Sequence, residues 1–447
     1  MTKPGNTSSR NQLGFFSVTM IVVSLVIGMG IFGTPANVAA SSGSVWIFFA
    51  AWMAGGLVAL CGALTYAEIG VRLPVMGAYY KVFSTCYHPV VGFTVNALIL
   101  ISNAASLGIV ALIGADYVSD LLFGKPSGAL FNILISIAAV IIFYIVNLFG
   151  LYTSSLAQNI LTTIKIALIV LLIGSMLKGV MVEPHGYIEG AQIYQFKDNH
   201  WLTLFLASMI PVSFSYGGYQ QTINFGSEIK DTRLLPRAII TGICIVIILY
   251  LALNLAYTQV IGYDKMKNAS AIGALLSEAL FGTTGAKVFD AFMFLSVLAY
   301  VNIILMSNPR VMYAMSGDKV FPAVFLRRHP KTQALVPALT AFSLATVFIT
   351  FFGKSVDSIL GFTMFLDSIG MSTSAAALFY LKRKQGKNTV PGNWTKLTPI
   401  LTVIFVLSYF GIAVAVIISK PKAAVTGMCL LLLLAVVYFI FYYKKKK

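Results

Sequence analysis

The amino-acid sequence predicts an all-α membrane protein, because apolar stretches long enough to cross a bilayer as helices follow one another along nearly the whole chain. Of the 447 residues, 58% are hydrophobic and only 10% are charged. A soluble domain cannot bury that much apolar surface. Twelve transmembrane helices are expected, near residues 14–40, 45–70, 89–121, 129–148, 151–178, 201–229, 238–260, 286–316, 335–352, 355–381, 397–419 and 423–443.

The placement of the basic residues predicts the topology. The net charge is +17, and most of the 31 Lys and Arg residues fall in alternate loops, on the side where the N-terminus would lie. Cytoplasmic loops are enriched in Lys and Arg. We therefore expect a multi-pass protein of the cell (inner) membrane with both termini in the cytoplasm. The basic charge indicates an anionic lipid leaflet as its partner, and no nucleic acid.

Two glycine-rich interruptions of apolar helices are the strongest indication of function. The first covers residues 24–35 and contains Gly28, Gly30 and Gly33, and the second covers residues 215–220. In lipid, a backbone group released from a helix must find another partner, or its burial costs several kcal/mol. Two broken helices in matching positions of two chain halves are typical of the substrate site of a transporter.

Two charged residues lie near the middle of predicted membrane helices. Lys165 is central in the helix expected at 151–178, and Asp367 is central in the helix expected at 355–381. Neither side chain reaches an interface from there, so each needs a partner within the protein. Lys165 either ties helices together or acts as a gating or coupling charge. Asp367 is either a proton relay or a structural tie.

Cysteine and histidine residues show no pattern of a metal or cofactor site, and we expect neither. The four cysteines are scattered, and the four histidines fall in loops or at helix ends (Cys61, Cys86, Cys244, Cys429; His88, His185, His200, His329). Neither set has the spacing of metal ligands. No nucleophile–base pair lies at membrane depth, which disfavours an intramembrane enzyme.

Five segments, in this order, resemble the amino acid–polyamine–organocation (APC) superfamily, and most closely its L-amino-acid transporter and serine/threonine exchanger branch. The resemblance covers the first ten helices. The segments are Gly28-Met-Gly-Ile-Phe-Gly-Thr-Pro35; Tyr66-Ala-Glu68 with the Pro/Gly/Tyr-rich loop after it; Phe214-Ser-Tyr-Gly-Gly-Tyr219; Glu228-Ile-Lys with Leu235-Pro-Arg237; and Asn302 with Arg310-Val-Met-Tyr-Ala314.

The resemblance implies a LeuT-like fold, in which two five-helix repeats of inverted topology follow each other and helices 1 and 6 are discontinuous. The corresponding division is a cytoplasmic tail at 1–13, a first repeat at 14–178, an outer loop at 179–200, a second repeat at 201–381, and helices 11 and 12 with a basic cytoplasmic C-terminus at 382–447.

The resemblance also implies the substrate-binding residues. Backbone N–H groups of Gly28, Met29 and Gly30, with Ile27 beside them, would bind the substrate carboxylate at a helix N-terminus. Carbonyl groups around Phe214, Ser215 and Gly217 would bind the substrate ammonium.

The resemblance further implies which residues act in gating and coupling. Phe214 matches the aromatic gate of the family, and Lys165 matches a lysine at the place where sodium-coupled relatives bind their ion, which implies sodium independence. Asn302 is assigned to the same group of gating and coupling residues. Asp367 is added to this group, although it lies in none of the family motifs.

The sequence departs from the family pattern at three places. Met29 stands where Ser or Ala is usual, Tyr219 replaces a Trp, and a paired acid is reduced to Ser227-Glu228. The first change alters the size of the expected pocket, so the amino acid carried stays open.

The predicted function is secondary active transport of an amino acid by alternating access, either as sodium-independent exchange or as proton-coupled symport. The expected partners are the amino acid, protons in the case of symport, and membrane lipid. An amino-acid sensor with the same fold is the alternative, and an intramembrane enzyme is a remote one. The oligomeric state stays open.

Overall fold

The computed structural model describes residues 12–125, 127–178, 200–267, 269, 272–352, 356–386, 393–419 and 421–442. Within these ranges the regular structure is helical, with two isolated β-bridges and no longer strand. The predicted tail at 1–13, the outer loop at 179–200 and the basic C-terminal lysines lie mostly or wholly outside the described residues.

The elements follow the chain in an order close to the one predicted. In the first half they are α1 (Phe15–Val26), α2 (Gly30–Ser42), α3 (Val45–Arg72), α4 (Ala78–Cys86), α5 (Pro89–Phe123), α6 (Ala129–Leu148), α7 (Leu151–Ile173) and η2 (Gly174–Lys178). In the second half they are α8 (Trp201–Ser215), η3 (Tyr219–Asn224), η4 (Gly226–Glu228), α9 (Leu234–Val260), α10 (Tyr263–Met266), α11 (Ile272–Phe281), η5 (Gly282–Thr284), α12 (Gly285–Gly317), η6 (Ala323–Leu326), α13 (Val336–Phe352), α14 (Val356–Gln385), η8 (Asn393–Lys396), α15 (Thr398–Ser419) and α16 (Pro421–Phe441).

The prediction of an all-helical membrane protein is confirmed. Among the described residues, nine helical segments are long and apolar enough to cross a membrane, and the bent pair α1 and α2 makes a tenth. The spans expected near 335–352 and 355–381 correspond to α13 and α14, which are not in that set. The number of twelve therefore stays a prediction.

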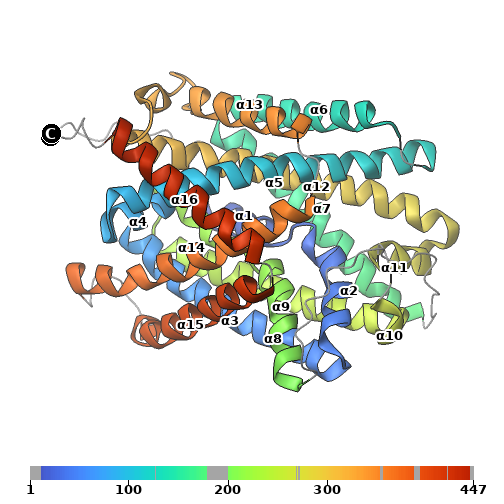
Figure 1. Cartoon of the computed structure of the whole chain (residues 1–447). Coiled ribbons are helices and arrows are strands. Elements are labelled where there is room, and N and C mark those ends of the chain that lie inside the picture. Colours follow the sequence, from blue (N-terminus) through green and yellow to red (C-terminus); the bar gives the residue numbers. More distant parts are fainter. Residues whose placement is uncertain are drawn as a thin grey trace.

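Helices from the two halves of the chain lie side by side (Figure 1). The long helices α5 and α12 pack against each other, and α6 and α13 run together along one flank. In the same way α3 packs against α9, and α2 packs against α8. Helices α10 and α11 lie at one end of the molecule and α4 lies toward the other.

An aromatic cluster fills the interior beside α8. The rings of Trp52, Tyr216 and Tyr250 lie with their centroids 5.1 to 5.9 Å apart, and all three side chains are buried. Helix α8 approaches α3 closely because Gly55 has no side chain: a Cβ atom there would lie 2.3 Å from Val212. For Gly55 the structure therefore shows close helix packing, as small residues in membrane helices commonly allow.

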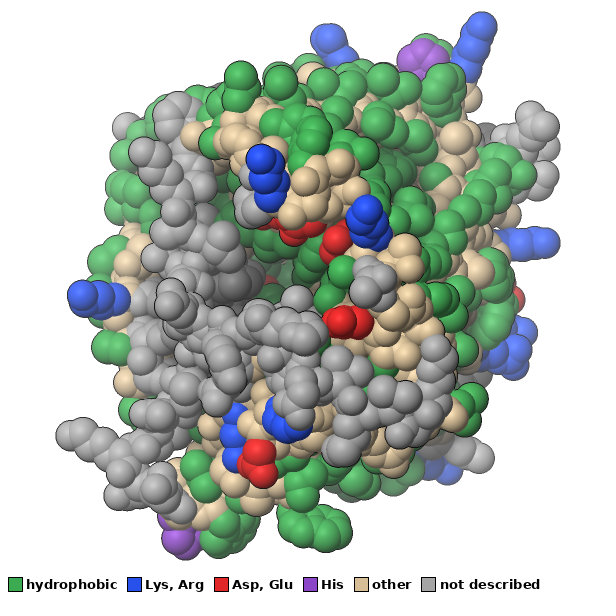
Figure 2. Space-filling model, turned by 90° about the vertical axis from the view of Figure 1, so that its right-hand side faces the viewer, with side chains coloured by type: hydrophobic (Ala, Val, Ile, Leu, Met, Phe, Trp, Pro, Cys, Tyr) green, Lys and Arg blue, Asp and Glu red, His purple; other side chains and the backbone are tan. Residues whose placement is uncertain are grey.

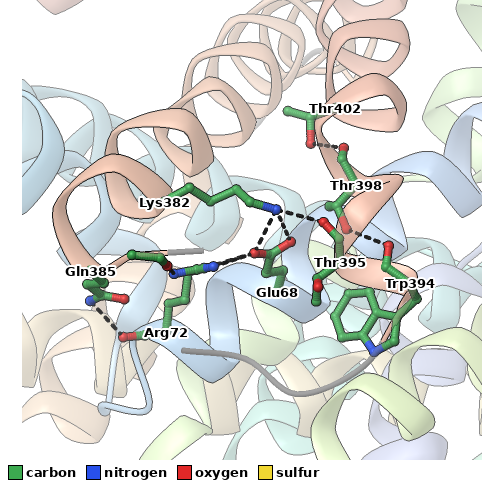
Figure 3. A network of polar contacts seen from close by, with 9 residues as sticks. Glu68, Arg72, Lys382, Gln385, Trp394, Thr395, Thr398 and Thr402 are labelled. Carbon is green, nitrogen blue, oxygen red and sulfur yellow. Dashed lines mark hydrogen bonds and ion pairs between the residues drawn. The ribbon is translucent and has the colours of Figure 1, made fainter. Parts of the chain in front are cut away.

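A buried ionic network joins α3 to α14 at the end of the molecule where α4 lies (Figure 3). Glu68 is fully buried and accepts hydrogen bonds from Arg72, at 2.9 and 2.7 Å, and from Lys382, at 3.0 Å. Lys382 also donates to the carbonyl oxygen of Thr395, and Arg72 donates to that of Gly386. The carboxylate thereby has two cationic partners, as a buried charge requires.

Candidate functional site

The first predicted break lies between α1 and α2. Helix α1 ends at Val26 and α2 begins at Gly30, with the two axes bent by 42°. Two glycines within three residues disfavour a continuous helix, since Gly lowers helix stability by about 1 kcal/mol relative to Ala. Gly33 lies inside α2, so only Gly28 and Gly30 contribute to the break itself.

The second predicted break follows α8. The α-helix ends at Ser215, and the chain turns at Gly218 with a φ of +107°, a conformation that residues other than Gly adopt rarely. Beyond it the chain continues as the 3₁₀-helices η3 and η4, where the sequence had suggested a resumed α-helix through Glu228. A Cβ atom on Gly218 would lie 2.2 Å from the carbonyl oxygen of Leu25, so the two breaks are in direct contact.

Two side chains hold carbonyl groups of the breaks. The hydroxyl group of Tyr250, on α9, lies 3.1 Å from the carbonyl oxygen of Val26 and 3.1 Å from that of Ser215. The ammonium group of Lys165, on α7, donates to the carbonyl oxygen of Ile27 at 2.6 Å. Three carbonyl groups released by the breaks thus find partners inside the protein, which is the condition for unwound backbone at membrane depth.

Other backbone groups at the breaks keep their hydrogen-bonding capacity. The N–H group of Gly28 donates to Val26 at 2.8 Å, whereas those of Met29, Gly30 and Ile31 have no acceptor among the described residues. These three belong to the N-terminus of α2, where N–H groups are unpaired and the helix dipole favours an anion.

The end of α8 offers unpaired hydrogen-bond acceptors. The carbonyl oxygens of Ser213 and Gly217 have no donor among the described residues, and neither has the buried hydroxyl group of Ser213. The carbonyl of Phe214 accepts from Gly217 at 3.2 Å, and that of Ser215 accepts from Tyr250. Of the three residues predicted to bind the substrate ammonium group, only Gly217 therefore has an unpaired carbonyl group among the described residues.

A cavity of about 340 Å³ brings the two sets of groups together. Its wall includes Gly28, Met29 and Gly30 from the first break, and Phe214, Ser215 and Gly217 from the second. Cavities of roughly 300–1,000 Å³ with mostly apolar walls and a few convergent polar groups are typical of small-molecule sites. Side chains of α5, α12, α14 and α15 complete the wall, among them Asn103, Tyr300, Asp367 and Tyr409.

Two polar pairs between α5 and α12 lie at the cavity wall. Asn103 donates to Asn308 at 2.7 Å, and the hydroxyl groups of Ser106 and Tyr300 lie 3.0 Å apart, so both pairs join α5 to α12 at its wall. Phe214 is 38% exposed at the end of α8.

Figure 2 shows the end of the molecule that carries α10 and α11, where the visible surface is hollowed near its centre with acidic side chains beside the hollow.

Polar contacts link three elements at the opposite end of the unwound segments, where a second cavity of about 250 Å³ has Glu228 and Arg310 in its wall. The backbone of Leu13 pairs with that of Glu228 and Lys230, at 2.7 and 3.1 Å. Glu228 in turn forms an ion pair with Arg310, with hydrogen bonds of 2.5 and 2.9 Å, and the Arg310 guanidinium lies 4.5 Å from the ring centre of Phe225. These contacts join the N-terminal segment, η4 and α12.

Asn302 does not line the cavity. It is fully buried on α12, donates to Ser154 at 3.0 Å and to Gln158 at 2.8 Å, and accepts from Asn147 at 3.0 Å. Gln158 donates onward to Ser24 in α1 at 2.6 Å. Asn302 therefore belongs to a polar network that ties α6, α7 and α12 to the helix before the first break.

Several residues of the site were not singled out from the sequence. Tyr250 lies in an apolar helix, where an aromatic residue gives no signal of its function, and Ser24 and Gln158 have no fixed spacing from their partners. A regular polar spacing in α7, at Ser154, Gln158, Thr162 and Lys165, could have marked the helix face that meets α1. Among the described residues, no group of three or more His, Cys, Asp and Glu side chains could hold a metal ion.

Comparison with known proteins identifies the family. A family model described as amino acid permease matches residues 13–441. The chain belongs to the amino acid permease family. The permease is 26% identical over 410 residues to the serine/threonine exchanger SteT of Bacillus subtilis (strain 168), a match that covers 90% of each chain.

Two human relatives extend the comparison. The large neutral amino acids transporter small subunit 2 is 24% identical to the permease over 405 residues, covering 90% of this chain and 75% of the relative. The cystine/glutamate transporter is 27% identical over 374 residues, covering 81% and 72%. The resemblance drawn from the sequence is confirmed, and the permease is a multi-pass membrane transport protein and not an enzyme.

Proposed function

We propose that the permease carries an amino acid across the membrane by alternating access and binds it in the cavity between the two breaks. One observation carries the proposal: unpaired N–H groups of Met29 and Gly30 and unpaired carbonyl groups of Ser213 and Gly217 belong to the wall of one cavity. A zwitterionic amino acid needs donors for its carboxylate and acceptors for its ammonium group, and two half-helices supply both. Ile27 and Phe214 flank these groups, and Phe214 covers the bound substrate.

The described conformation corresponds to an outward-facing state of this cycle. The hollow in the surface lies at the end with α10 and α11, whereas the ion pair of Glu228 with Arg310 and the pairing of Leu13 with Glu228 link elements at the other end. In the inward-facing state these contacts separate. Their separation is compatible with transport because each consists of a few polar contacts rather than a continuous apolar interface.

The permease has twelve transmembrane helices with an inverted repeat of 14–178 and 201–381, followed by two further helices in 382–447. The packing of α2 with α8, α3 with α9, α5 with α12 and α6 with α13 supports this assignment, because each pair joins corresponding helices of the two repeats. Arg72, Lys81 and Lys382 lie at the end with α4, which is therefore the cytoplasmic end, together with both termini.

Transport is independent of sodium and proceeds as exchange. The carbonyl group of Ile27 already accepts from the Lys165 ammonium, so a sodium ion would meet a fixed positive charge at this break. Exchange is further supported by the resemblance to the serine/threonine exchanger. Asn302 acts in this scheme by holding Gln158 against Ser24 and thereby positions α1.

Uptake into proteoliposomes tests the proposal. A panel of labelled amino acids is added to vesicles that contain unlabelled amino acid, and to empty vesicles with an inward proton gradient, each with and without sodium. Exchange predicts uptake only into preloaded vesicles and no effect of sodium. Uptake driven by the proton gradient alone would establish symport instead, and binding without any uptake would establish a sensor.

A further inference from the structure

Asp367 is an acidic side chain in the cavity that the proposed binding of the amino-acid backbone does not use. It lies on α14, is partly buried, and is the only residue with a full formal charge among the described residues of the cavity wall. It forms no hydrogen bond or ion pair with any side chain in the part of the chain that the structure describes. A structural tie between helices would show such a partner.

An ionised carboxylate in this place requires a positive charge, because removing it from water without one is costly. The cavity wall, as described, contains no Lys, Arg or His. Lys165 does not line the cavity, and its ammonium group is directed to the carbonyl oxygen of Ile27. A positive charge that pairs with the ionised carboxylate must therefore enter the cavity from outside.

The surroundings of Asp367 suit an organic cation. Tyr300 and Tyr409 line the same cavity wall as Asp367. Aromatic rings attract ammonium and guanidinium groups through their electron-rich faces. Because Tyr300 is held by Ser106, its ring is fixed at the wall.

Near the outer ends of α5 and α12, three carboxylates stand against two basic residues, Lys125 and Lys287. The carboxylates are those of Asp116, Asp120 and Asp290; all three lie near Tyr117, and Asp116 and Asp290 each lie near Asp120. Ile113, one helical turn before Tyr117, belongs to the cavity wall. Carboxylates at the entrance of a site raise the local concentration of cations and speed their association.

We propose that the permease prefers amino acids with a cationic side chain, and that Asp367 binds the side-chain ammonium or guanidinium group. This inference rests on the proposed function, since it assigns the side-chain part of the same site. The α-carboxylate and α-ammonium groups bind at the two breaks, and the side chain extends toward α14 between Tyr300 and Tyr409.

Matched pairs of amino acids test the preference directly. L-Arginine is compared with L-citrulline, and L-lysine with L-norleucine, because each neutral partner has nearly the same length without the charge. Exchange is measured in preloaded proteoliposomes, and binding is measured as the rise in unfolding temperature of the purified protein. The cation of each pair is expected to exchange at least about tenfold faster and to stabilise the protein more, since removing one partner of a buried charge pair has a large effect.

Three variants locate the preference. Asp367→Asn should reduce the uptake of the cations to the level of their neutral partners, and Asp367→Glu should keep the preference. Asp264→Asn is the control, because it removes an equal charge from an ion pair with Lys267 outside the cavity, where Asp264 is 89% exposed. This variant should behave like the unaltered protein.

The outcomes separate the inference from the proposed function. Equal binding of the charged and neutral partners, or a cation preference that persists in Asp367→Asn, would overturn the inference while uptake of L-serine or other neutral amino acids still supports transport. Cation-selective binding without any uptake would overturn transport alone. If Asp367→Asn changes only the pH dependence of neutral amino-acid uptake, the carboxylate is a proton site and the inference is wrong.

Discussion

The ammonium group of Lys165 lies 2.6 Å from the carbonyl oxygen of Ile27, although 138 positions separate the two residues in the sequence. This contact joins the middle of α7 to the first residue after α1. A buried lysine in a membrane helix is costly unless it meets an acceptor, and an unwound carbonyl group is costly unless it meets a donor. Each residue thus provides the partner that the other one needs.

Replacing Lys165 tests whether this contact supports transport. Lys165→Met keeps most of the side-chain volume but leaves the Ile27 carbonyl unpaired, at a cost of about 1–3 kcal/mol. We expect exchange to fall by roughly tenfold or more while the purified protein still elutes as a folded species. Exchange at the normal rate, measured in proteoliposomes, would leave Lys165 as a tie between helices only.

Removing the hydroxyl group of Tyr250 tests the link between the breaks. Tyr250→Phe keeps the ring against Trp52 and Tyr216 but removes the hydroxyl group that lies between the carbonyl oxygens of Val26 and Ser215. The free energy of unfolding should therefore fall by about 0.5–1.5 kcal/mol, and exchange should slow. Tyr144→Phe is the matched control, because it removes a hydroxyl group that contacts Thr340 between α6 and α13. Equal exchange rates of the two variants would show that the Tyr250 hydroxyl has no part in transport.

Enlarging Met29 tests the location of the substrate. Met29→Trp should fill the cavity and abolish uptake of every amino acid without unfolding the protein, because Met29 is part of the cavity wall. Met53→Trp, at an exposed position on α3, serves as the control and should transport normally. Normal uptake by Met29→Trp, measured with the same labelled panel, would place the substrate elsewhere.

Adding one methyl group at Gly218 tests the contact between the two breaks. Gly218→Ala combines an unfavourable positive φ with a clash against Leu25, so we expect the folded state to lose about 2 kcal/mol or more, with reduced yield of folded protein. Gly411→Ala on α15 has no neighbouring atom within 4 Å of the new methyl group and should be tolerated. Similar unfolding temperatures for the two variants would refute the close approach.

Neutralising Glu68 tests the buried ionic network. Glu68→Gln leaves Arg72 and Lys382 without a carboxylate, and breaking a buried ion pair in this way destabilises a protein by about 3–5 kcal/mol. Asp264→Asn removes an exposed carboxylate and should change stability by less than about 1 kcal/mol. Thermal unfolding of both purified variants provides the measurement, and an unchanged unfolding temperature of Glu68→Gln would mean that the network is not needed for stability.

Helix positions and the places of the breaks were predictable because they depend on local composition. The ranges expected near 89–121 and 129–148 agree closely with α5 and α6, since lipid requires long uninterrupted apolar helices. The first break was expected around Gly28 and Gly30, and it lies there. The form of the second break was less predictable, because the same residues can continue as an α-helix or as the 3₁₀-helix η3, and the contact of Gly218 with Leu25 favours the turn that is observed.

Hydrophobicity and glycine content act within each segment, so the amino-acid sequence was enough to predict a helical membrane protein with two interrupted helices. Which backbone groups remain unpaired depends instead on how the helices pack in three dimensions. This packing placed Tyr250 and Lys165 on the carbonyl groups of Val26, Ile27 and Ser215, and it brought Asp367 to the cavity wall. These contacts join residues that are far apart in the chain, and no local pattern of side chains specifies such distances.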